Sequence, residues 1–330
     1  MRDITKKCVV IGIMLVEICF GFVLLKKTYF AVVEKEKVKG IAVVDKRLVE
    51  RSLESNLKFF YKPKANEKIE DHPSWLDQKV FYTINSKGEN ERFEYETKKP
   101  IGTFRIVTIG DSHTFGHYVN TKDNYPEKLE DELNILNSNN FYCPKKNKVE
   151  VINLGVMGYD AEYTIHRFRE DGERYSSDLI IWFLKNDDIN EILEQILPRI
   201  KEVKTEILEK NPHFYDDPIN IYNTRQQVKK EIKELLGVDA IIDYNRKLIE
   251  NFIQDVKVPI IFLTYKSESE INNILTSYTE LFLHIRVFSD LSLQEIDRLT
   301  DGHPSSLGYS HLAKKISNYL VDNQDWLCGN

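Results

Sequence analysis

Two short polar segments of the sequence carry residue types that could catalyse acyl transfer. Ser112 lies in GDSHTFG, directly after an apolar run, and His303 lies in DGHPSSLGY, two residues after Asp301. A serine hydroxyl is a weak nucleophile, which a neutral imidazole can activate by accepting its proton. A carboxylate can fix the tautomer of that imidazole and stabilise its charged form. The residue types therefore indicate a triad of Ser112, His303 and Asp301, with Asp297 and Asp290 as reserve acids.

Glycine and asparagine residues in two further segments could donate hydrogen bonds to a developing oxyanion. Gly158 lies in NLGVMGYD and Asn186 lies in KNDD. A glycine allows close approach to its backbone, an asparagine offers a side-chain N–H, and losing one oxyanion donor typically costs about 10²–10³ in rate. The predicted oxyanion hole consists of the backbone N–H groups of Ser112 and Gly158 and the side chain of Asn186. Taken singly, each of these residues also fits a turn or a helix cap.

The elements that must position these side chains are strands buried on both faces. The apolar runs predict five of them, the last being the weakest: 104–110, 149–153, 179–185, 258–265 and 285–288. Helical stretches lie between them, with Pro126 at a first helical position and Asp160 as the cap of 161–175. A terminal amphipathic helix is expected over 310–321.

Alternating strands and helices predict an α/β fold, a flavodoxin-like doubly wound parallel sheet of about five strands with helices on both faces. Ligands of such sheets bind beyond the carboxyl ends of the strands. All the polar segments named above fall at or near such ends. The residues 187–250 are too long for one crossover and are expected to form a helical insertion.

The four polar segments resemble, in order, the four motif blocks of the SGNH, or GDSL-type, serine hydrolase family. GDSHTFG resembles the block with the nucleophile, NLGVMGY the block whose later glycine donates its N–H, KNDD the block with the asparagine donor, and DGHPSSLGYSHLA the block with the acid and the histidine. The blocks extend from Gly102 to Leu312. The resemblance implies an esterase that works through an acyl-enzyme and needs neither metal nor organic cofactor.

Three positions depart from the pattern of that family. His113 stands where Leu or Phe is usual, and Leu184 replaces a glycine of the third block. One residue, instead of two, separates Asp301 from His303, which is why the reserve acids are retained.

Two other functions remain open at this stage. Members of the same family act as O-acyltransferases on cell-surface polysaccharide, and the residues do not separate transfer from hydrolysis. A non-catalytic module that binds a glycan or a partner through the same cleft is a third reading. A small-molecule or glycan ester is thus the expected substrate, and the sequence does not indicate an oligomeric state.

Composition and charge exclude several classes. The chain has 330 residues, 42% of them hydrophobic, and a net charge of −6. This is not the composition of a disordered chain, and no basic excess suggests nucleic acid. Asp187 and Asp188 lack further metal ligands and more readily cap a helix. Cys143 and Cys328 fit either a disulfide or two free thiols.

The N-terminal residues predict a membrane anchor over 1–27. Cys8–Leu25 is an 18-residue apolar run with one charge, Glu17. As a helix it would span about 27 Å, close to the hydrocarbon thickness of a bilayer. Two lysines follow directly, and no small-residue cleavage site precedes them, which disfavours a cleaved signal peptide.

The predicted organisation is therefore an anchor, a juxtamembrane stalk and irregular lead-in over 28–100, and a hydrolase domain over 101–330. Three basic residues, Arg2, Lys6 and Lys7, precede the apolar run and five lysines follow it by Lys39. By the positive-inside rule, this count does not favour an outward-facing domain. The family resemblance instead suggests a single-pass bacterial membrane protein with an extracytoplasmic catalytic domain.

Overall fold

A five-stranded parallel sheet forms the centre of the fold. The computed structural model describes residues 49–51, 57–73, 75–137, 143–216 and 218–328. The sheet order is β6-β5-β7-β8-β9, and every neighbouring pair is parallel. This is the flavodoxin-like order 2-1-3-4-5, so the predicted α/β sheet is confirmed. The strands are β5 (Thr103–Gly110), β6 (Lys148–Asn153), β7 (Leu179–Phe183), β8 (Ile260–Tyr265) and β9 (Ile285–Leu291).

Helices cover both faces of the sheet, which explains the continuous apolar runs of its strands. Every residue of β5, β7 and β8 is buried. Successive side chains of a strand point to opposite faces. Ile181 and Phe183 accordingly belong to one core cluster, whereas Ile180 and Trp182 belong to the other.

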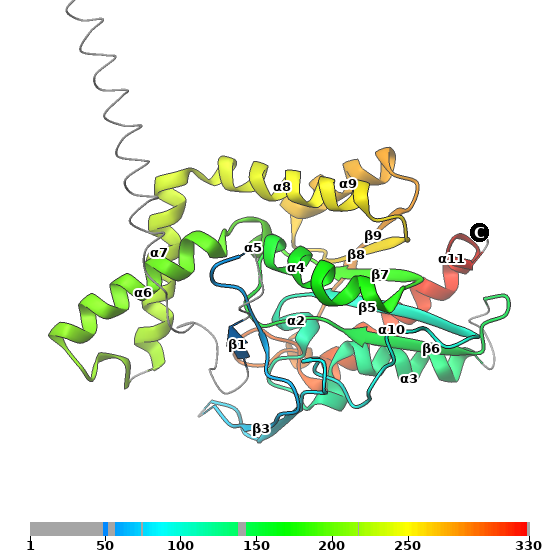
Figure 1. Cartoon of the computed structure of the whole chain (residues 1–330), viewed down its shortest axis with the longest axis horizontal. Coiled ribbons are helices and arrows are strands. Elements are labelled where there is room, and N and C mark those ends of the chain that lie inside the picture. The colour runs from blue at the N-terminus through cyan, green and yellow to red at the C-terminus, as the bar shows by residue number, and fades with distance from the viewer. Residues whose placement is uncertain (1–48, 52–56, 74, 138–142, 217, 329–330) are drawn as a thin grey trace, which may run out of the picture. The chain divides into compact units, whose positions relative to one another are not determined.

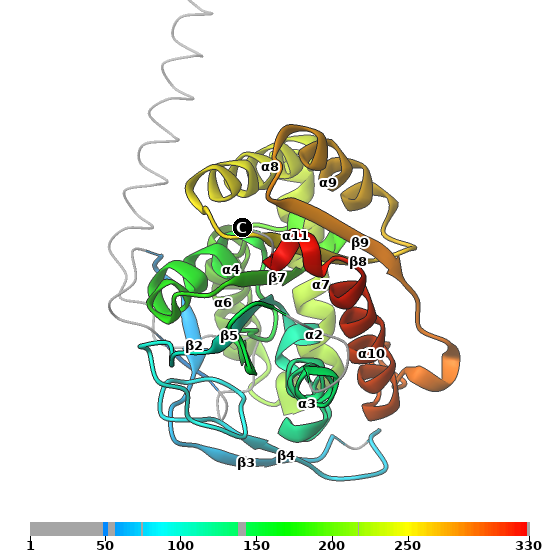
Figure 2. The same ribbon diagram turned by 90° about the vertical axis from the view of Figure 1, so that its right-hand side faces the viewer.

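Each core cluster is closed by its own set of helices, shown on the two sides of the sheet in Figure 2. One set comprises α3 (Tyr125–Asn137), α10 (Ser306–Asp322) and α11 (Gln324–Cys328). The other comprises α4 (Ala161–Arg167), α8 (Val238–Asp255) and α9 (Ser269–Leu281).

The predicted helix starts lie close to the observed ones. Pro126 is the second residue of α3, and the Asp160 side chain caps α4 by accepting the Tyr163 N–H at 2.9 Å. After Arg167 the chain continues in π-helical and 3₁₀ turns to Tyr175. The terminal helix α10 begins four residues before the predicted start, because Ser305 accepts the Gly308 N–H and caps it.

Within the predicted insertion, two long helices pack on each other. After the short α5 (Asn186–Ile189) come α6 (Leu193–Lys210) and α7 (Pro218–Leu236), which Figure 1 shows beyond the sheet. The helix α8, which ends this stretch, instead packs on the sheet through Ile249 and Phe252. The α6–α7 contact is a small apolar cluster of Ile196, Ile200, Val228 and Ile232.

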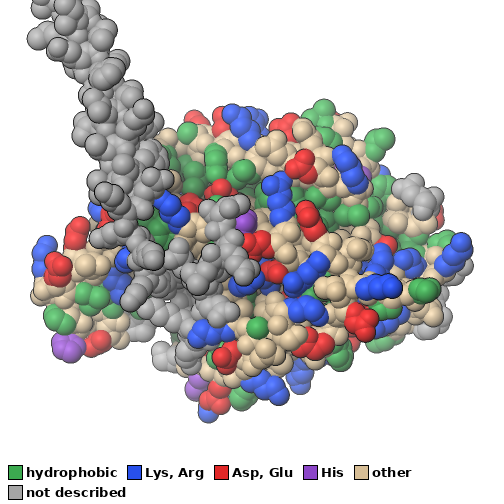
Figure 3. All heavy atoms as spheres, in the orientation of Figure 1, with side chains coloured by type: hydrophobic (Ala, Val, Ile, Leu, Met, Phe, Trp, Pro, Cys, Tyr) green, Lys and Arg blue, Asp and Glu red, His purple; other side chains and the backbone are tan. Residues whose placement is uncertain are grey.

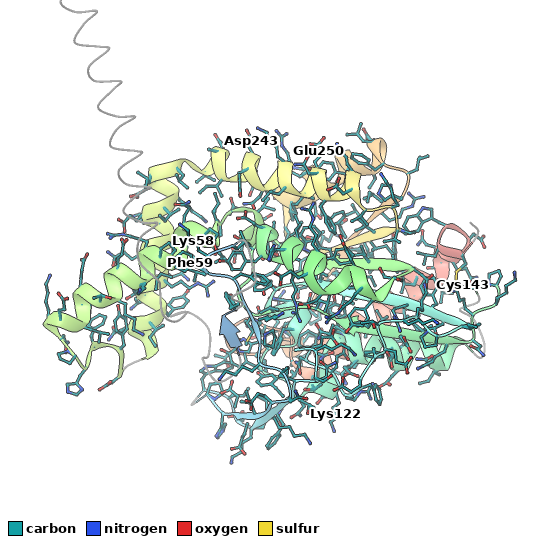
Figure 4. All side chains as sticks on the ribbon, in the orientation of Figure 1. Lys58, Phe59, Lys122, Cys143, Asp243 and Glu250 are labelled. Atoms are coloured by element: carbon teal, nitrogen blue, oxygen red, sulfur yellow. A yellow bond between two sulfur atoms is a disulfide. The ribbon has the colours of Figure 1, made fainter. Side chains whose placement is uncertain are left out.

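The lead-in forms two short antiparallel pairs. The strand β1 (Val49–Arg51) pairs with β2 (Tyr61–Pro63), and β3 (Lys68–Asp71) pairs with β4 (Val80–Thr83). The backbone N–H groups of Lys58 and Phe59, labelled in Figure 4, donate to the Glu194 carboxylate at 3.2 and 2.9 Å. The lead-in is thereby tied to the start of α6.

A disulfide joins Cys143, which precedes β6, to Cys328, the last residue of α11. The two Cα atoms are 5.1 Å apart, although 185 residues separate them in sequence. Figure 4 shows Cys143 beside α11. The sequence fits either a disulfide or two free thiols, and the structure has the disulfide.

The membrane segment expected at 8–25 lies outside the described residues, as does most of the predicted stalk. Among the residues that are described, no helix is both long and apolar enough to cross a bilayer.

Basic and acidic side chains are interspersed over the face drawn in Figure 3.

Candidate active site

The polar segments converge at the carboxyl end of the sheet, next to the point where the strand order reverses. Gly110, the last residue of β5, is paired with Phe183, the last residue of β7. Beyond them lies a cleft of about 980 Å³, and its lining includes Ser112, Gly158 and His303. This is where the topology of an open α/β sheet places its ligands.

Ser112 is in hydrogen-bond contact with His303. Ser112 begins the short helix α2 (Ser112–Phe115), and Asp111 caps this helix by accepting the His113 N–H at 2.9 Å. The Ser112 Oγ lies 2.8 Å from Nε2 of His303. This is the distance that proton transfer from a hydroxyl to an imidazole requires.

Asp301 holds the other side of the same imidazole. Its Oδ2 lies 2.6 Å from the His303 Nδ1, and its Oδ1 accepts the His303 backbone N–H at 3.1 Å. Gly302, between them, has a φ of 93°, and its N–H donates to the Leu299 carbonyl at 2.9 Å. This tight turn folds the acid back onto the ring, which explains how a spacing of only one residue suffices.

The contact with His303 also sets the charge of the acid. Partial burial alone would raise the pKa of Asp301, but the hydrogen bonds and the charge of His303 outweigh it and lower that pKa. The carboxylate is therefore ionised at neutral pH and can stabilise an imidazolium.

The two reserve acids lie elsewhere. Asp297 is buried and contacts Nδ1 of His311 at 2.8 Å. Asp290 lies on the surface, 3.6 Å from the Lys266 ammonium. Asp301 is thus the acid that the structure brings to His303.

Lys185, Asp111 and His113 form a cluster of ionisable side chains next to the nucleophile Ser112, which was not anticipated from the sequence. The Lys185 Nζ lies 2.8 Å from Asp111 Oδ2, and the His113 ring stacks on the His303 ring with centroids 4.9 Å apart. Burial would raise the pKa of Asp111, but Lys185 and His113 hold it well below its usual range. Burial and the Lys185 charge lower the pKa of His113 to about 4, so this ring is neutral. A lysine at the end of a strand buried on both faces was the signal that could have revealed the group.

Ser112 and Gly158, the two predicted backbone donors, both belong to the lining of the cleft. Gly158 has a φ of 76°, which favours glycine, and a Cβ there would lie 3.3 Å from the Tyr61 hydroxyl. Among the described residues, neither the Ser112 nor the Gly158 backbone N–H has a hydrogen-bond acceptor. Both residues line the cleft, as predicted for oxyanion donors.

Asn186, the third predicted oxyanion donor, is not among the residues that line the cleft. Its Oδ1 accepts the Ile271 N–H of α9 at 3.0 Å, and its own N–H donates to Glu268 at 2.9 Å. The residues of this loop that line the cleft are Lys185, Asp187 and Asp188. Asp188 caps α5 by accepting the Lys185 N–H at 2.8 Å, in the capping role that the sequence suggested.

The lead-in and the insertion supply the outer walls of the cleft. Trp75 comes from the lead-in, and Tyr222, Arg225 and Lys229 come from α7. No motif marks these positions in the sequence. Within the described part of the chain, no group of three His, Cys, Asp or Glu side chains is arranged to hold a metal ion.

Neither a protein-family model nor a curated protein matches the sequence. Solved structures do resemble the chain. A G-D-S-L family protein from Desulfitobacterium hafniense is 21% identical over 65% of this chain and 98% of its own, with a TM-score of 0.36.

Two further neighbours are esterases. The psychrotrophic esterase EstA from Pseudoalteromonas sp. is 13% identical over 68% of this chain and 98% of its own, with a TM-score of 0.38. A family 3 carbohydrate esterase from Clostridium thermocellum is 15% identical over 68% of this chain and 99% of its own, with a TM-score of 0.39. At such scores, the assignment of chemistry to this chain rests on its own site geometry.

Proposed function

We propose that the protein is a serine esterase of the SGNH type, which cleaves an acyl or acetyl ester through an acyl-enzyme intermediate. One observation carries the proposal, the continuous chain of contacts from the Ser112 hydroxyl through His303 to Asp301. A nucleophile, a base and an orienting acid in series have the geometry that acyl transfer requires.

In the first half of the reaction, the Ser112 Oγ attacks the ester carbonyl while His303 Nε2 takes its proton. The tetrahedral intermediate then collapses, the bond to the alcohol breaks, and His303 returns the proton to the leaving oxygen. The product is an ester between Ser112 and the acyl group. Asp301 stabilises the imidazolium that exists between the two proton transfers.

In the second half, a water molecule attacks the acyl-enzyme. His303 takes a proton from the water and gives it to the Ser112 oxygen as the carboxylic acid leaves. In both halves the negative oxygen is held by the N–H groups of Ser112 and Gly158, which have no other acceptor among the described residues.

The walls of the cleft support a glycan ester as the substrate. Trp75 and Tyr222 line the cleft and are 36% and 58% exposed. The negative faces of aromatic rings attract the C–H groups of sugar rings. Transfer of the acyl group to a sugar hydroxyl instead of water would use the same residues, and the division of products between free acid and acylated glycan measures it.

The hydrolysis of p-nitrophenyl acetate tests the proposal. We expect turnover by the wild type and its loss in Ser112→Ala and in His303→Ala. His311→Ala is the matched control, because His311 also contacts an aspartate but does not line the cleft. Absence of turnover in a folded wild type, or equal turnover in Ser112→Ala, would reject the proposal.

We further propose that residues 8–25 anchor the protein in a bacterial membrane with the catalytic domain outside the cytoplasm. The Cys143–Cys328 disulfide supports a position of the catalytic domain outside the cytoplasm, because disulfides persist in oxidising compartments. Protease digestion of intact cells should remove the catalytic domain, and protection of that domain would place it in the cytoplasm.

A further inference from the structure

Among the described residues that line the cleft, the third motif block does not contribute its asparagine. Asn186 is turned to α9, and the residues of its loop that line the cleft include two carboxylic acids, Asp187 and Asp188. A carboxyl side chain carries no N–H donor, and that of Asp188 already caps α5 by accepting the Lys185 N–H at 2.8 Å. Lys185 also lines the cleft, but its ammonium is held by Asp111.

Arg225 of the inserted helix α7 lines the same cleft and lies beside Gly158. A Cβ built on Gly158 would be 3.5 Å from Nη2 and 3.7 Å from Nη1 of Arg225. The other group near Gly158 is the Tyr61 hydroxyl, which donates to the Met157 carbonyl at 2.8 Å. Of these two groups beside Gly158, only the guanidinium has no hydrogen-bond acceptor among the described residues.

The guanidinium is also poorly satisfied within the protein. Among the residues that the structure describes, its buried Nε has no hydrogen-bond partner, and the carboxylate that its Nη2 approaches, that of Glu191, is 4.0 Å away. Lys229, one turn further along α7, contacts the same Glu191 closely and lines the same cleft. Of these two cations, Lys229 is engaged by Glu191, and Arg225 is available to a ligand.

We propose that Arg225 is a catalytic residue of the esterase reaction, donating from its guanidinium to the carbonyl oxygen of the ester as that oxygen becomes negative. This rests on the proposed function and assigns to the insertion the task that Asn186 has in the family pattern. A guanidinium offers several N–H donors and a permanent charge, so its bond to an oxyanion is stronger than the bond to a neutral carbonyl. The interaction therefore acts mainly in the transition state and on kcat.

Kinetics of p-nitrophenyl acetate hydrolysis by Arg225→Met, Arg225→Lys and Lys229→Met test the proposal. We expect kcat of Arg225→Met to fall by about 10²–10³-fold with a smaller change in KM, the usual cost of one oxyanion donor. Arg225→Lys keeps the charge and should recover part of kcat. Lys229→Met removes a cation from the same helix and the same Glu191, and should change kcat far less.

Each other outcome is decisive. Equal losses in Arg225→Met and Lys229→Met, or a loss confined to KM, would show a general electrostatic or binding effect and overturn the proposal. An unchanged kcat in Arg225→Met would overturn it while the esterase assignment stands, provided that Ser112→Ala is inactive. If Arg225→Met does not fold, a kcat of the folded Arg225→Lys equal to that of the wild type overturns it. A folded wild type without turnover rejects both proposals together.

Discussion

The Ser112 Oγ lies 2.8 Å from His303 Nε2, although 191 residues separate the two along the chain. Ser112 follows the first strand of the parallel sheet, and His303 precedes the helix that follows the last strand. Two loops at the same edge of one sheet thus meet across the cleft. The proposed acyl transfer depends on this contact between Ser112 and His303.

The Asp301–His303 contact predicts a strong effect of Asp301→Asn. The amide cannot stabilise the imidazolium and favours the wrong tautomer, so we expect kcat to fall by about 10²–10⁴-fold. The Asp301 side chain is 27% exposed, which argues for the lower part of that range. Steady-state kinetics would measure it, with Asp290→Asn as the control. A larger loss of kcat in Asp290→Asn than in Asp301→Asn would mean that Asp290, and not Asp301, is the acid of the triad.

The position of Asn186 predicts a mild effect of Asn186→Ala on catalysis. We expect a change in kcat well short of the roughly 10²–10³-fold cost of an oxyanion donor. The Ile271 N–H would lose its acceptor, so the free energy of unfolding should drop by about 1 kcal/mol. Gly158→Ala is the comparison, because its φ of 76° is strained for alanine and we expect it to impair kcat. A loss of kcat in Asn186→Ala as large as in Gly158→Ala would place Asn186 in the oxyanion hole.

The buried neutral ring of His113 predicts a dependence of stability on pH. Its pKa is about 4 in the folded protein, against an ordinary value of 6.5. Between these values the unfolded chain binds a proton that the folded protein does not, so stability decreases as pH falls through this window. From pH 7 to pH 5 this one group should remove about 2 kcal/mol.

Urea unfolding of the wild type and of His113→Phe at pH 7 and pH 5 would measure that difference. The variant lacks the titrating ring but keeps the buried Asp111 and Lys185 beneath Ser112. We expect the wild type to lose about 2 kcal/mol more than the variant. Parallel losses would mean that the folded protein binds a proton at His113 as readily as the unfolded chain does.

The Cys143–Cys328 disulfide predicts that reduction destabilises the fold. The link closes a long loop, and the loss of a native disulfide typically costs roughly 3–5 kcal/mol. We expect a reducing agent to lower the Tm of the wild type but not that of a Cys143→Ser, Cys328→Ser double variant. An insensitive wild type with the same Tm as the double variant would show that the two thiols are not paired.

The strands and the triad could be predicted because each depends on a local pattern. Runs buried on both faces mark the five strands, and the short turn at Gly302 keeps Asp301 and His303 together whatever the rest of the chain does. The parallel sheet then brings Ser112 to them.

The oxyanion side chain could not be predicted, because it depends on which residue of a loop turns inward. Asn186 and Asp187 are successive polar residues after β7, and the turn into α5 decides which of them faces the cleft. Arg225 lies on a helix whose position comes from packing against α6 and not from any motif. Sequence patterns do not specify such long-range placement.

The most direct test of the central claim is the site of covalent labelling by a fluorophosphonate, which reacts with an activated serine and stays bound to it. Peptide mass mapping of the labelled wild type should find the adduct on Ser112, with labelling strongly slowed in His303→Ala and abolished in Ser112→Ala. A folded wild type that takes up no label, or takes it up equally after Ser112→Ala, would contradict the account.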